Sequence, residues 1–216
     1  SYPDEVVYII DDHEDIGESL GFLLRTAQLQ SRFFTDPGVF LETVDARSCG
    51  CLLLDLGLGE KHESGLAVLE KLKERGIKLP TMVVSAKTDS HTIVQAMKNG
   101  AADYLFKPLD YKQILFKLTQ LLESDRQRRQ LDAVLAEYRE KFETLSPREK
   151  VILPEIVKGY SSEQIGSNHN TAGRTVETQR GSIINKLGAK NVTHLAFLYG
   201  CCYPEAILDE TNAVET

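Results

Sequence analysis

The chain has 216 residues, of which 42% are hydrophobic and 26% are charged, and its formal net charge is −7. This composition is typical of a soluble folded protein with one large domain or two small ones. The sequence has no apolar run near the ~20 residues of a membrane span, and its acidic first residues do not resemble a signal peptide. We therefore expect a soluble cytoplasmic protein, whose four cysteines are reduced.

The charge is unevenly distributed along the chain. Residues 146–200 contain seven Lys or Arg and four Asp or Glu, so this segment carries +3 and the rest of the chain −10. A mildly basic module joined to an acidic one predicts two domains with different partners.

The first 110 residues alternate between apolar or β-branched runs and amphipathic helical patterns. Runs such as "GCLLL" are apolar throughout, which is typical of strands buried on both faces. Their alternation with helices predicts an α/β domain with a five-stranded, doubly wound parallel sheet. The predicted strands are residues 6–10, 30–34, 50–54, 79–85 and 103–107, and the helices between them are 14–28, 37–44, 64–76 and 89–100.

A long helix is predicted from residue 111 to 145, where the chain contains no glycine or proline. Its apolar residues recur at alternating spacings of four and three, which makes a heptad-like seam. Two interpretations remain open: a linker helix with one face packed on a domain, or a short dimeric coiled coil. The residues of the seam are Leu131, Leu135, Tyr138, Phe142 and Leu145.

Four short helices are predicted after this long helix. Ser146 with Glu149, and Ser161 with Gln164, have the spacing of capping boxes at two helix starts. Four helices in roughly 55 residues predict a small all-α module. Residues 204–216 form an acidic tail.

Polar side chains stand where the predicted strands end. Asp11 and Asp12 follow the first strand, Asp55 follows the third, Ser85 ends the fourth and Lys107 ends the fifth. The C-terminal ends of parallel strands meet at one edge of a sheet, so these groups are expected to share a crevice. Three carboxylates repel one another unless a cation joins them, and such oxygen ligands favour Mg²⁺. Together with the lysine, they predict a site where a carboxylate attacks a phosphoryl group.

These positions carry a family resemblance. Residues 5–122 resemble a receiver domain of the two-component response regulators, whose acidic pair, phosphoacceptor, switch hydroxyl and lysine match the strand-end residues just named. Residues 145–200 resemble a LuxR-type helix-turn-helix, in "LSPREKVILPEIVKGYSSEQIGS" and "RTVETQRGSIINKLGAKN". Together the two segments are similar to the NarL/FixJ subfamily over nearly the whole chain.

The resemblance implies a flavodoxin-like receiver fold followed by a four-helix DNA-binding domain. It implies a bacterial transcription regulator that a sensor histidine kinase phosphorylates, and that then binds DNA as a homodimer formed through helix 4, strand 5 and helix 5. The implied domains are a receiver domain at 1–122, a helical linker at 123–144, a DNA-binding domain at 145–203 and a tail at 204–216.

The resemblance also assigns roles to single residues. The phosphoacceptor is Asp55, and Mg²⁺ is held by Asp11, Asp12, Asp55 and the carbonyl of Gly57. The lysine is Lys107, and the switch residues are Ser85 and Tyr104, which lies three residues before the lysine. On the expected recognition helix 173–187, the residues at base edges are Glu177, Thr178 and Gly181, and those at phosphates are Arg174, Arg180 and Lys186.

The chain departs from the family pattern at several positions. The loop after Asp55 lacks the usual proline and reaches Gly65 ten residues later, so we expect a loop two residues longer and more mobile. Pro154 lies inside a predicted helix, where proline costs ~3 kcal/mol and causes a kink. Polar residues replace apolar ones in the helix-turn-helix core, and an alanine replaces the usual serine cap, so we expect an altered turn. The residues concerned are His169, Thr171 and Ala172.

Two other functions share parts of this pattern. A phosphatase of the haloacid dehalogenase type also uses a nucleophilic aspartate, but it carries a second aspartate two residues later, where this chain has Gly57. We therefore do not expect a turnover enzyme. A receiver whose output module binds protein or RNA in place of DNA remains open.

Overall fold

The protein is described by a computed structural model that covers residues 5–58, 64–86 and 90–206. It divides into two compact units, residues 1–129 and residues 130–216. Within the described ranges, no helix combines the length and the apolar character that crossing a membrane requires.

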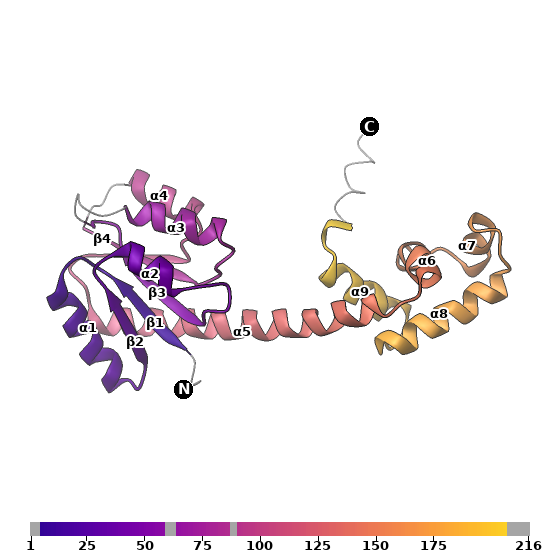
Figure 1. The fold of residues 1–216 in the computed structure, drawn as a ribbon, viewed down its shortest axis with the longest axis horizontal. Helices are drawn as coiled ribbons and strands as arrows, with labels where there is room; N and C mark the ends of the chain where they lie inside the picture. The colour runs from indigo at the N-terminus through magenta and orange to yellow at the C-terminus, as the bar shows by residue number, and fades with distance from the viewer. Residues whose placement is uncertain (1–4, 59–63, 87–89, 207–216) are drawn as a thin grey trace. The chain divides into compact units, whose positions relative to one another are not determined.

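Unit 1 is built on a parallel sheet with the strand order β2-β1-β3-β4-β5 (Figure 1). The order places β1 and β3 at the centre, which explains their continuous apolar sequences. The predicted doubly wound α/β fold is therefore confirmed. The strands are β1 (Val6–Ile10), β2 (Gln30–Phe34), β3 (Gly50–Asp55), β4 (Thr81–Ser85) and β5 (Asp103–Phe106).

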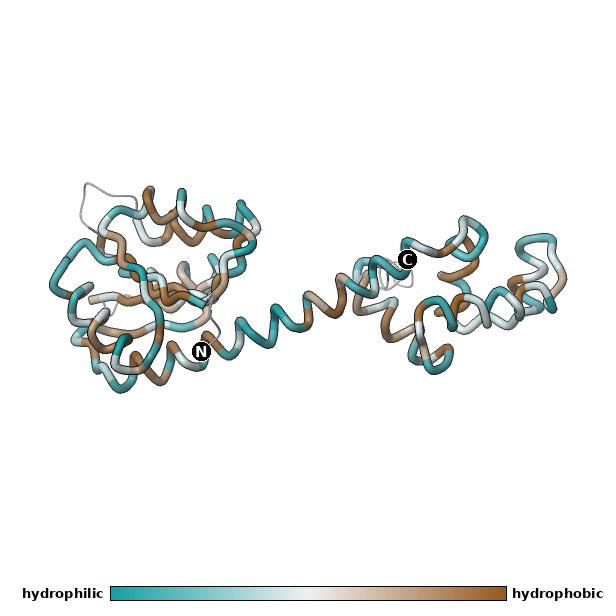
Figure 2. Tube along the Cα trace, turned by 60° about the horizontal axis from the view of Figure 1, so that its bottom comes forward, coloured by the Kyte–Doolittle hydropathy of each residue, from teal (hydrophilic) through white to brown (hydrophobic). Residues whose placement is uncertain are grey.

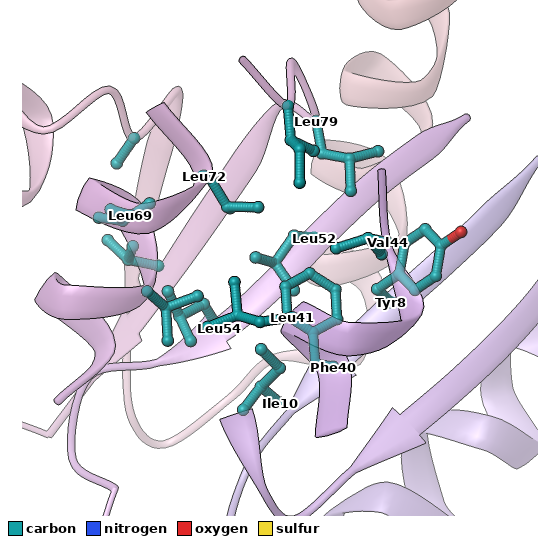
Figure 3. Close-up of a cluster of buried hydrophobic side chains, with 14 of the residues drawn as sticks. Tyr8, Ile10, Phe40, Leu41, Val44, Leu52, Leu54, Leu69, Leu72 and Leu79 are labelled. Carbon is teal, nitrogen blue, oxygen red and sulfur yellow. The ribbon is translucent and has the colours of Figure 1, made fainter. Parts of the chain in front are cut away.

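Helices cover both faces of the sheet. Because alternate residues of each strand point to opposite faces, each inner strand contributes side chains to two apolar cores. Tyr8 and Ile10 of β1 pack with Phe40 of α2 and Leu69 of α3 on one face (Figure 3). Val7 and Ile9 pack with α1 and α5 on the other. In Figure 2 hydrophobic (brown) segments run through the middle of this unit, and hydrophilic (teal) residues recur on its outer helices and turns. The helices are α1 (Glu14–Thr26), α2 (Pro37–Thr43), α3 (Gly65–Glu74), α4 (Ser90–Lys98) and the first part of α5 (Tyr111–Glu143).

Unit 2 is an all-α bundle with its own apolar core. The second part of α5 contributes Phe142 to this core, with Leu135 and Tyr138 packed against it, whereas Leu131 is 57% exposed. Leu145, two residues after the end of α5, also belongs to this core. Most of the heptad-like seam thus packs on the bundle, as the first of the two open interpretations expects. The helices are α6 (Pro147–Val157), α7 (Ser162–Asn168), α8 (Gly173–Leu187) and α9 (Val192–Cys202).

The proline in α6 does not end that helix. The helix runs without interruption from Pro147 to Val157 through Pro154. Both predicted capping boxes are present, at Ser146 and Ser161. The predicted linker, residues 123–144, is the continuation of α5, so no loop separates it from the receiver.

Candidate functional site

The residues at the C-terminal edge of the sheet come together as the topology requires. Asp55 is the last residue of β3, and Asp11 directly follows β1, its neighbour in the sheet. The Nζ atom of Lys107 lies 2.7 Å from Oδ2 of Asp55 and 3.4 Å from Oδ2 of Asp11. Both carboxylates are buried, with 3% and 4% of their residue surface exposed. One lysine therefore bridges two buried carboxylates from neighbouring strands.

His13 also belongs to this site, a role that the sequence pattern did not predict. Its Nδ1 atom lies 3.1 Å from Oδ1 of Asp11 and 2.9 Å from Oδ1 of Asp12. Its backbone N–H also donates to Asp11, at 2.9 Å. A histidine directly after an acidic pair was the available signal, but an imidazole at a helix start has many structural roles. Its side chain is 59% exposed, so it covers the two carboxylates from the solvent side.

The site raises the pKa of both basic groups. Burial lowers the pKa of Lys107, but its hydrogen bond with Asp55 and the charges of Asp55 and Asp11 outweigh burial, so the net shift is upward. The hydrogen bond with Asp11, followed by the charges of Asp12 and Asp11, raises the pKa of His13. The carboxylates thus create a field that favours positive charge.

The donor set fits a hard divalent cation. Ligand atoms of Asp11, Asp12 and His13 all lie within 4.8 Å of one another. Asp55 reaches this group through the ammonium of Lys107. Carboxylate oxygens at the edge of a crevice are the ligands that Mg²⁺ takes in proteins, together with backbone carbonyls and water.

The backbone around Asp55 is fixed by two glycines. The N–H of Gly57 donates to Oδ1 of Asp55 at 2.9 Å, so this residue lies beside the carboxylate, while the role of its carbonyl as a ligand of Mg²⁺ stays a prediction. A Cβ atom on Gly65, the first residue of α3, would come within 2.7 Å of the carbonyl oxygen of Asp55. Glycine there allows α3 to begin directly against the strand end. The predicted lengthening concerns the loop between these glycines, most of which (59–63) lies outside the described residues.

Ser85 and Tyr104 lie on the two strands that follow β3 in the sheet. Ser85 is buried at the end of β4, and its carbonyl accepts the N–H of Lys107 at 3.0 Å. Tyr104 is 39% exposed on β5, and its ring packs edge-on against Phe106, 5.4 Å between centroids. The serine thus belongs to the lysine-bearing edge, whereas the tyrosine points outward.

In unit 2, α7 and α8 are joined by a tight turn. A Cβ atom on Gly166 of α7 would lie 2.7 Å from the carbonyl oxygen of Thr171, so the turn packs directly on the helix backbone. Asn170 has a φ of 49°, a left-handed conformation that asparagine tolerates. Ala172 is the N-cap of α8 and makes no side-chain capping bond, as its sequence predicts. Two helices joined in this way form a helix-turn-helix.

The polar residue at the end of α7 has a partner. Nε2 of His169 lies 2.5 Å from Oε1 of Glu155, whose other oxygen accepts a bond from Asn168. These bonds, from Asn168 first and then His169, lower the pKa of Glu155. The turn therefore replaces the expected apolar contact with a polar contact between α6 and α7.

The expected DNA contacts on α8 separate into two groups. Arg174, Glu177, Thr178 and Gly181 are exposed at helical spacing, opposite a buried apolar face. The hydroxyl of Thr178 also donates to the carbonyl of Arg174 at 3.1 Å. These four residues form one solvent-facing stripe on the helix.

The other two basic residues of α8 contact their own domain. The guanidinium of Arg180 donates to the carbonyl of Tyr160, in the loop between α6 and α7. Lys186 pairs at 2.8 Å with buried Glu149, which also accepts a bond from Ser182 at 2.7 Å. Both residues thus hold α8 against α6 and its loop, a use that their charge alone did not indicate.

Comparison with known families agrees with both units. The family model of the response regulator receiver domain matches residues 7–119, and that of the bacterial regulatory proteins of the luxR family matches residues 143–199.

Several known proteins resemble the chain over most of its length. It is 33% identical to the response regulator protein TodT of Pseudomonas putida, over 88% of this chain and 83% of the relative. It is 27% identical to the transcriptional regulatory protein FixJ of Bradyrhizobium diazoefficiens, over 89% of this chain and 93% of the relative. Among solved structures, response regulator StyR has a TM-score of 0.74 with 29% identity, over 90% of this chain and 98% of the other. Full-length FixJ from B. japonicum has a TM-score of 0.56 with 26% identity, over 92% of this chain and 97% of the other.

Proposed function

Because the chain belongs to the response regulators that join a receiver domain to a LuxR-type DNA-binding domain, we propose that phosphorylation of Asp55 controls its binding to DNA. The observation that carries this proposal is the bridge from Lys107 to buried Asp55 and Asp11 at one sheet edge. The bridge supports the proposal because it places an ammonium where it would neutralise a phosphoryl group attached to Asp55.

The proposed reaction is a phosphoryl transfer. A carboxylate oxygen of Asp55 attacks the phosphorus of a phosphohistidine on a sensor histidine kinase, so a P–O bond forms while the P–N bond breaks and the imidazole of the kinase leaves. Lys107, already 2.7 Å from Asp55, neutralises the phosphoryl oxygens. The product is an acyl phosphate on Asp55.

The oxygens of Asp11, Asp12 and Asp55 and the carbonyl of Gly57 would hold Mg²⁺, which neutralises negative charge on the phosphoryl group when it is bound. His13 contacts two of these carboxylates. Because most of its side chain lies in solvent, it can release them without disturbing the core.

The response to phosphorylation is proposed to pass through β5. Ser85 would bond the new phosphoryl oxygens, and Tyr104 would turn inward from its exposed position. Apolar side chains are exposed on the face of α4 and β5: Val94 (49%), Met97 (42%) and Phe106 (41%). Such side chains support a homodimer through α4, β5 and α5.

In the dimer, two copies of α8 would enter successive major grooves of DNA. Glu177, Thr178 and Gly181 would face base edges, and Arg174 would contact phosphate. Arg180 and Lys186 would have to leave their contacts with Tyr160 and Glu149 to reach phosphates. We therefore expect Arg174 to be the main phosphate contact of the helix.

The test is intact mass after incubation with acetyl phosphate and Mg²⁺, followed by mobility shift on the promoter beside the gene. We expect one phosphate adduct in the native chain, none in Asp55→Asn, and a full adduct in the control Asp45→Asn, whose aspartate is exposed and pairs with Arg47. We also expect phosphorylation to tighten DNA binding. An undiminished adduct in Asp55→Asn would contradict the assignment, and a phosphorylated protein that shifts no DNA would favour a protein or RNA target.

A further inference from the structure

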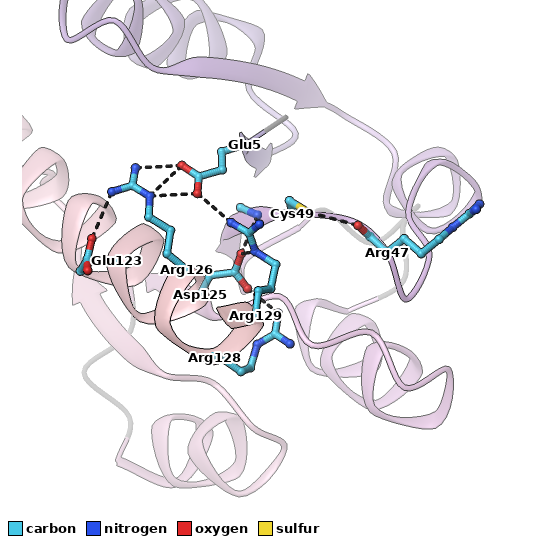
Figure 4. Close-up of polar contacts among 9 residues, drawn as sticks. Glu5, Arg47, Cys49, Glu123, Asp125, Arg126, Arg128 and Arg129 are labelled. Atoms are coloured by element: carbon cyan, nitrogen blue, oxygen red, sulfur yellow. Dashed lines mark hydrogen bonds and ion pairs between the residues drawn. The ribbon is translucent and has the colours of Figure 1, made fainter. Parts of the chain in front are cut away.

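A second cluster of buried charge lies at the opposite, N-terminal edge of the sheet (Figure 4). Its centre is Asp125 of α5, which is 1% exposed. Oδ2 of Asp125 accepts the backbone N–H of Gly50, the first residue of β3, at 3.1 Å. Helix α5 is therefore bonded directly to the start of the strand that ends in Asp55.

Arginines on the same helix neutralise Asp125. Nε of Arg129 lies 2.7 Å from Oδ2, and a terminal nitrogen of Arg128 lies 2.5 Å from Oδ1. Arg129 also reaches Glu5, just before β1, at 2.7 Å. We refer to Glu5, Gly50, Asp125, Arg128 and Arg129 as the clamp.

Arg126 adds a further tie between α5 and β1. Its guanidinium bonds Glu5 through two nitrogens, at 2.8 and 2.9 Å, and Glu123 at 3.1 Å. The bond with Glu5 is the main cause of its raised pKa. Glu5 is buried, whereas the side chain of Glu123 is 53% exposed.

The burial of two carboxylates in this network is poorly explained by stability alone. Burying charges costs desolvation energy, so a buried ion pair often gains no stability over a well-packed apolar contact. The best-attested use of such pairs is to fix one arrangement of the elements that they join. Here the network fixes the register of α5 against the starts of β1 and β3.

One end of β3 therefore contacts helix α5, and the other end contacts the segment that leads into this helix. At one end, Asp55 pairs with Lys107, four residues before α5 begins. At the other end, Gly50 bonds Asp125. All six residues of β3 are buried, so the strand is held rigidly between these contacts. Beyond the clamp, α5 continues as helix to Glu143, where its side chains join the core of unit 2.

We propose that Asp125 is a positioning residue that couples the phosphorylation state of Asp55 to the part of α5 beyond the clamp. This inference rests on the proposed function. The clamp makes α5 follow β3, so a displacement at the phosphorylated end of the strand reaches the residues that follow Arg129. Without the clamp, phosphorylation would still occur, but it would no longer reposition the helix.

The test compares the native chain with Asp125→Asn and Arg129→Gln. The measured quantity is the coupling ratio, the DNA dissociation constant before phosphorylation divided by that after it. We expect both variants to accept phosphate from acetyl phosphate as the native chain does, but with a coupling ratio at least about fivefold smaller. The control Glu123→Gln removes an exposed partner of Arg126 and should keep the native ratio within about twofold.

Amide hydrogen exchange of residues 126–135 gives a second readout. Phosphorylation should alter exchange there in the native chain and in Glu123→Gln, but not in the clamp variants. Native coupling and native exchange in a folded Asp125→Asn would overturn the inference. If Asp125→Asn does not fold, the same two measurements on Arg129→Gln test the inference. This variant should fold, because Asp125 keeps its bonds with Arg128 and Gly50. If the native chain shows no change in DNA affinity, the proposed function fails, and the exchange comparison still tests the clamp.

Discussion

The two edges of the receiver sheet both bury carboxylates, but they balance the charge differently. At the N-terminal edge, Glu5 and Asp125 are each paired with arginines at 2.5–2.8 Å. At the C-terminal edge, the carboxylates of Asp11, Asp12 and Asp55 contact Lys107 and the exposed imidazole of His13. Counted over the residues that the structure describes, the first edge is therefore close to neutral, and the second has an excess of negative charge.

This difference separates a structural use of buried charge from a chemical one. A buried carboxylate that is fully paired with cations holds those partners in place, because removal of one partner leaves a buried charge without compensation. Carboxylates in excess raise the electrostatic energy until a cation or a charged reactant arrives. In the functions proposed above, the same residue types thus fix geometry at one edge and bind ligands at the other.

The largest effect is expected on the rate of phosphorylation when the metal is removed from the C-terminal edge. In EDTA the three carboxylates should repel the phosphoryl donor, since several kcal/mol of charge neutralisation is lost. Phosphorylation of Asp55 should then slow at least about a thousandfold and recover in excess Mg²⁺. The rate of mass gain with acetyl phosphate measures this. A native rate in EDTA would show that Lys107 and His13 neutralise the site alone.

The next largest effect is on stability, and it should have opposite signs at the two edges. Asp125→Ala leaves two half-buried guanidinium groups and the N–H of Gly50 without their carboxylate, so we expect a loss of about 3 kcal/mol in the free energy of unfolding. Asp12→Ala removes one of three mutually repelling carboxylates, so we expect no loss, or a gain of up to about 1 kcal/mol.

Urea unfolding followed by circular dichroism, in EDTA, measures both changes. Equal losses in the two variants would show that the C-terminal edge is as fully compensated as the clamp. That result would remove the distinction between the two edges.

Glu149 extends the comparison to the DNA-binding unit. Burial disfavours its charged form, but hydrogen bonds from Lys186, Ser146 and Ser182 outweigh burial and lower its pKa to about 2 from 4.5. Because the folded pKa lies below the unfolded one, the charged form stabilises the fold above pH 4.5. This contribution is lost as the pH falls from 4.5 towards 2.

The measurement is the difference in unfolding free energy between the native chain and Glu149→Gln. We expect about 2 kcal/mol at pH 6, shrinking steadily below pH 4.5. The control Glu163→Gln changes an exposed carboxylate in the first turn of α7 and should show a small difference at every pH. A difference for Glu149→Gln that does not vary with pH would contradict the assigned role of its charge.

The parallel sheet and the C-terminal site were predictable because their signals are local in sequence. Apolar strands that end in Asp11, Asp55, Ser85 and Lys107 determine which edge carries the site, since parallel strands end together. Capping boxes likewise mark helix starts within four residues. The family resemblance added roles to positions that this pattern had already selected.

Contacts between distant elements were not predictable in this way. Asp125 reads as one of several charges in "ESDRQRR", and nothing nearby indicates that it bonds Gly50 from 75 residues away. Arg180 and Lys186 likewise read as solvent-facing charges, but their partners lie on α6 or in the loop after it. Charge predicts a partner but does not say whether the partner is DNA or the protein itself.

The smallest effects are expected on α8, where the same distinction between compensated and available charge applies. Arg174 is exposed, so Arg174→Ala in both protomers should lower the log-log salt slope of DNA binding by about two. Arg180 bonds the carbonyl of Tyr160, so Arg180→Ala should leave that slope nearly unchanged while loosening the loop before α7. Thr178→Ala should alter base preference by about 1 kcal/mol at one position. Binding to a randomised operator library at two salt concentrations separates these outcomes. If Arg180→Ala changes the slope and Arg174→Ala does not, Arg180 leaves its own domain to bind DNA, and its contact in the free protein is a resting state.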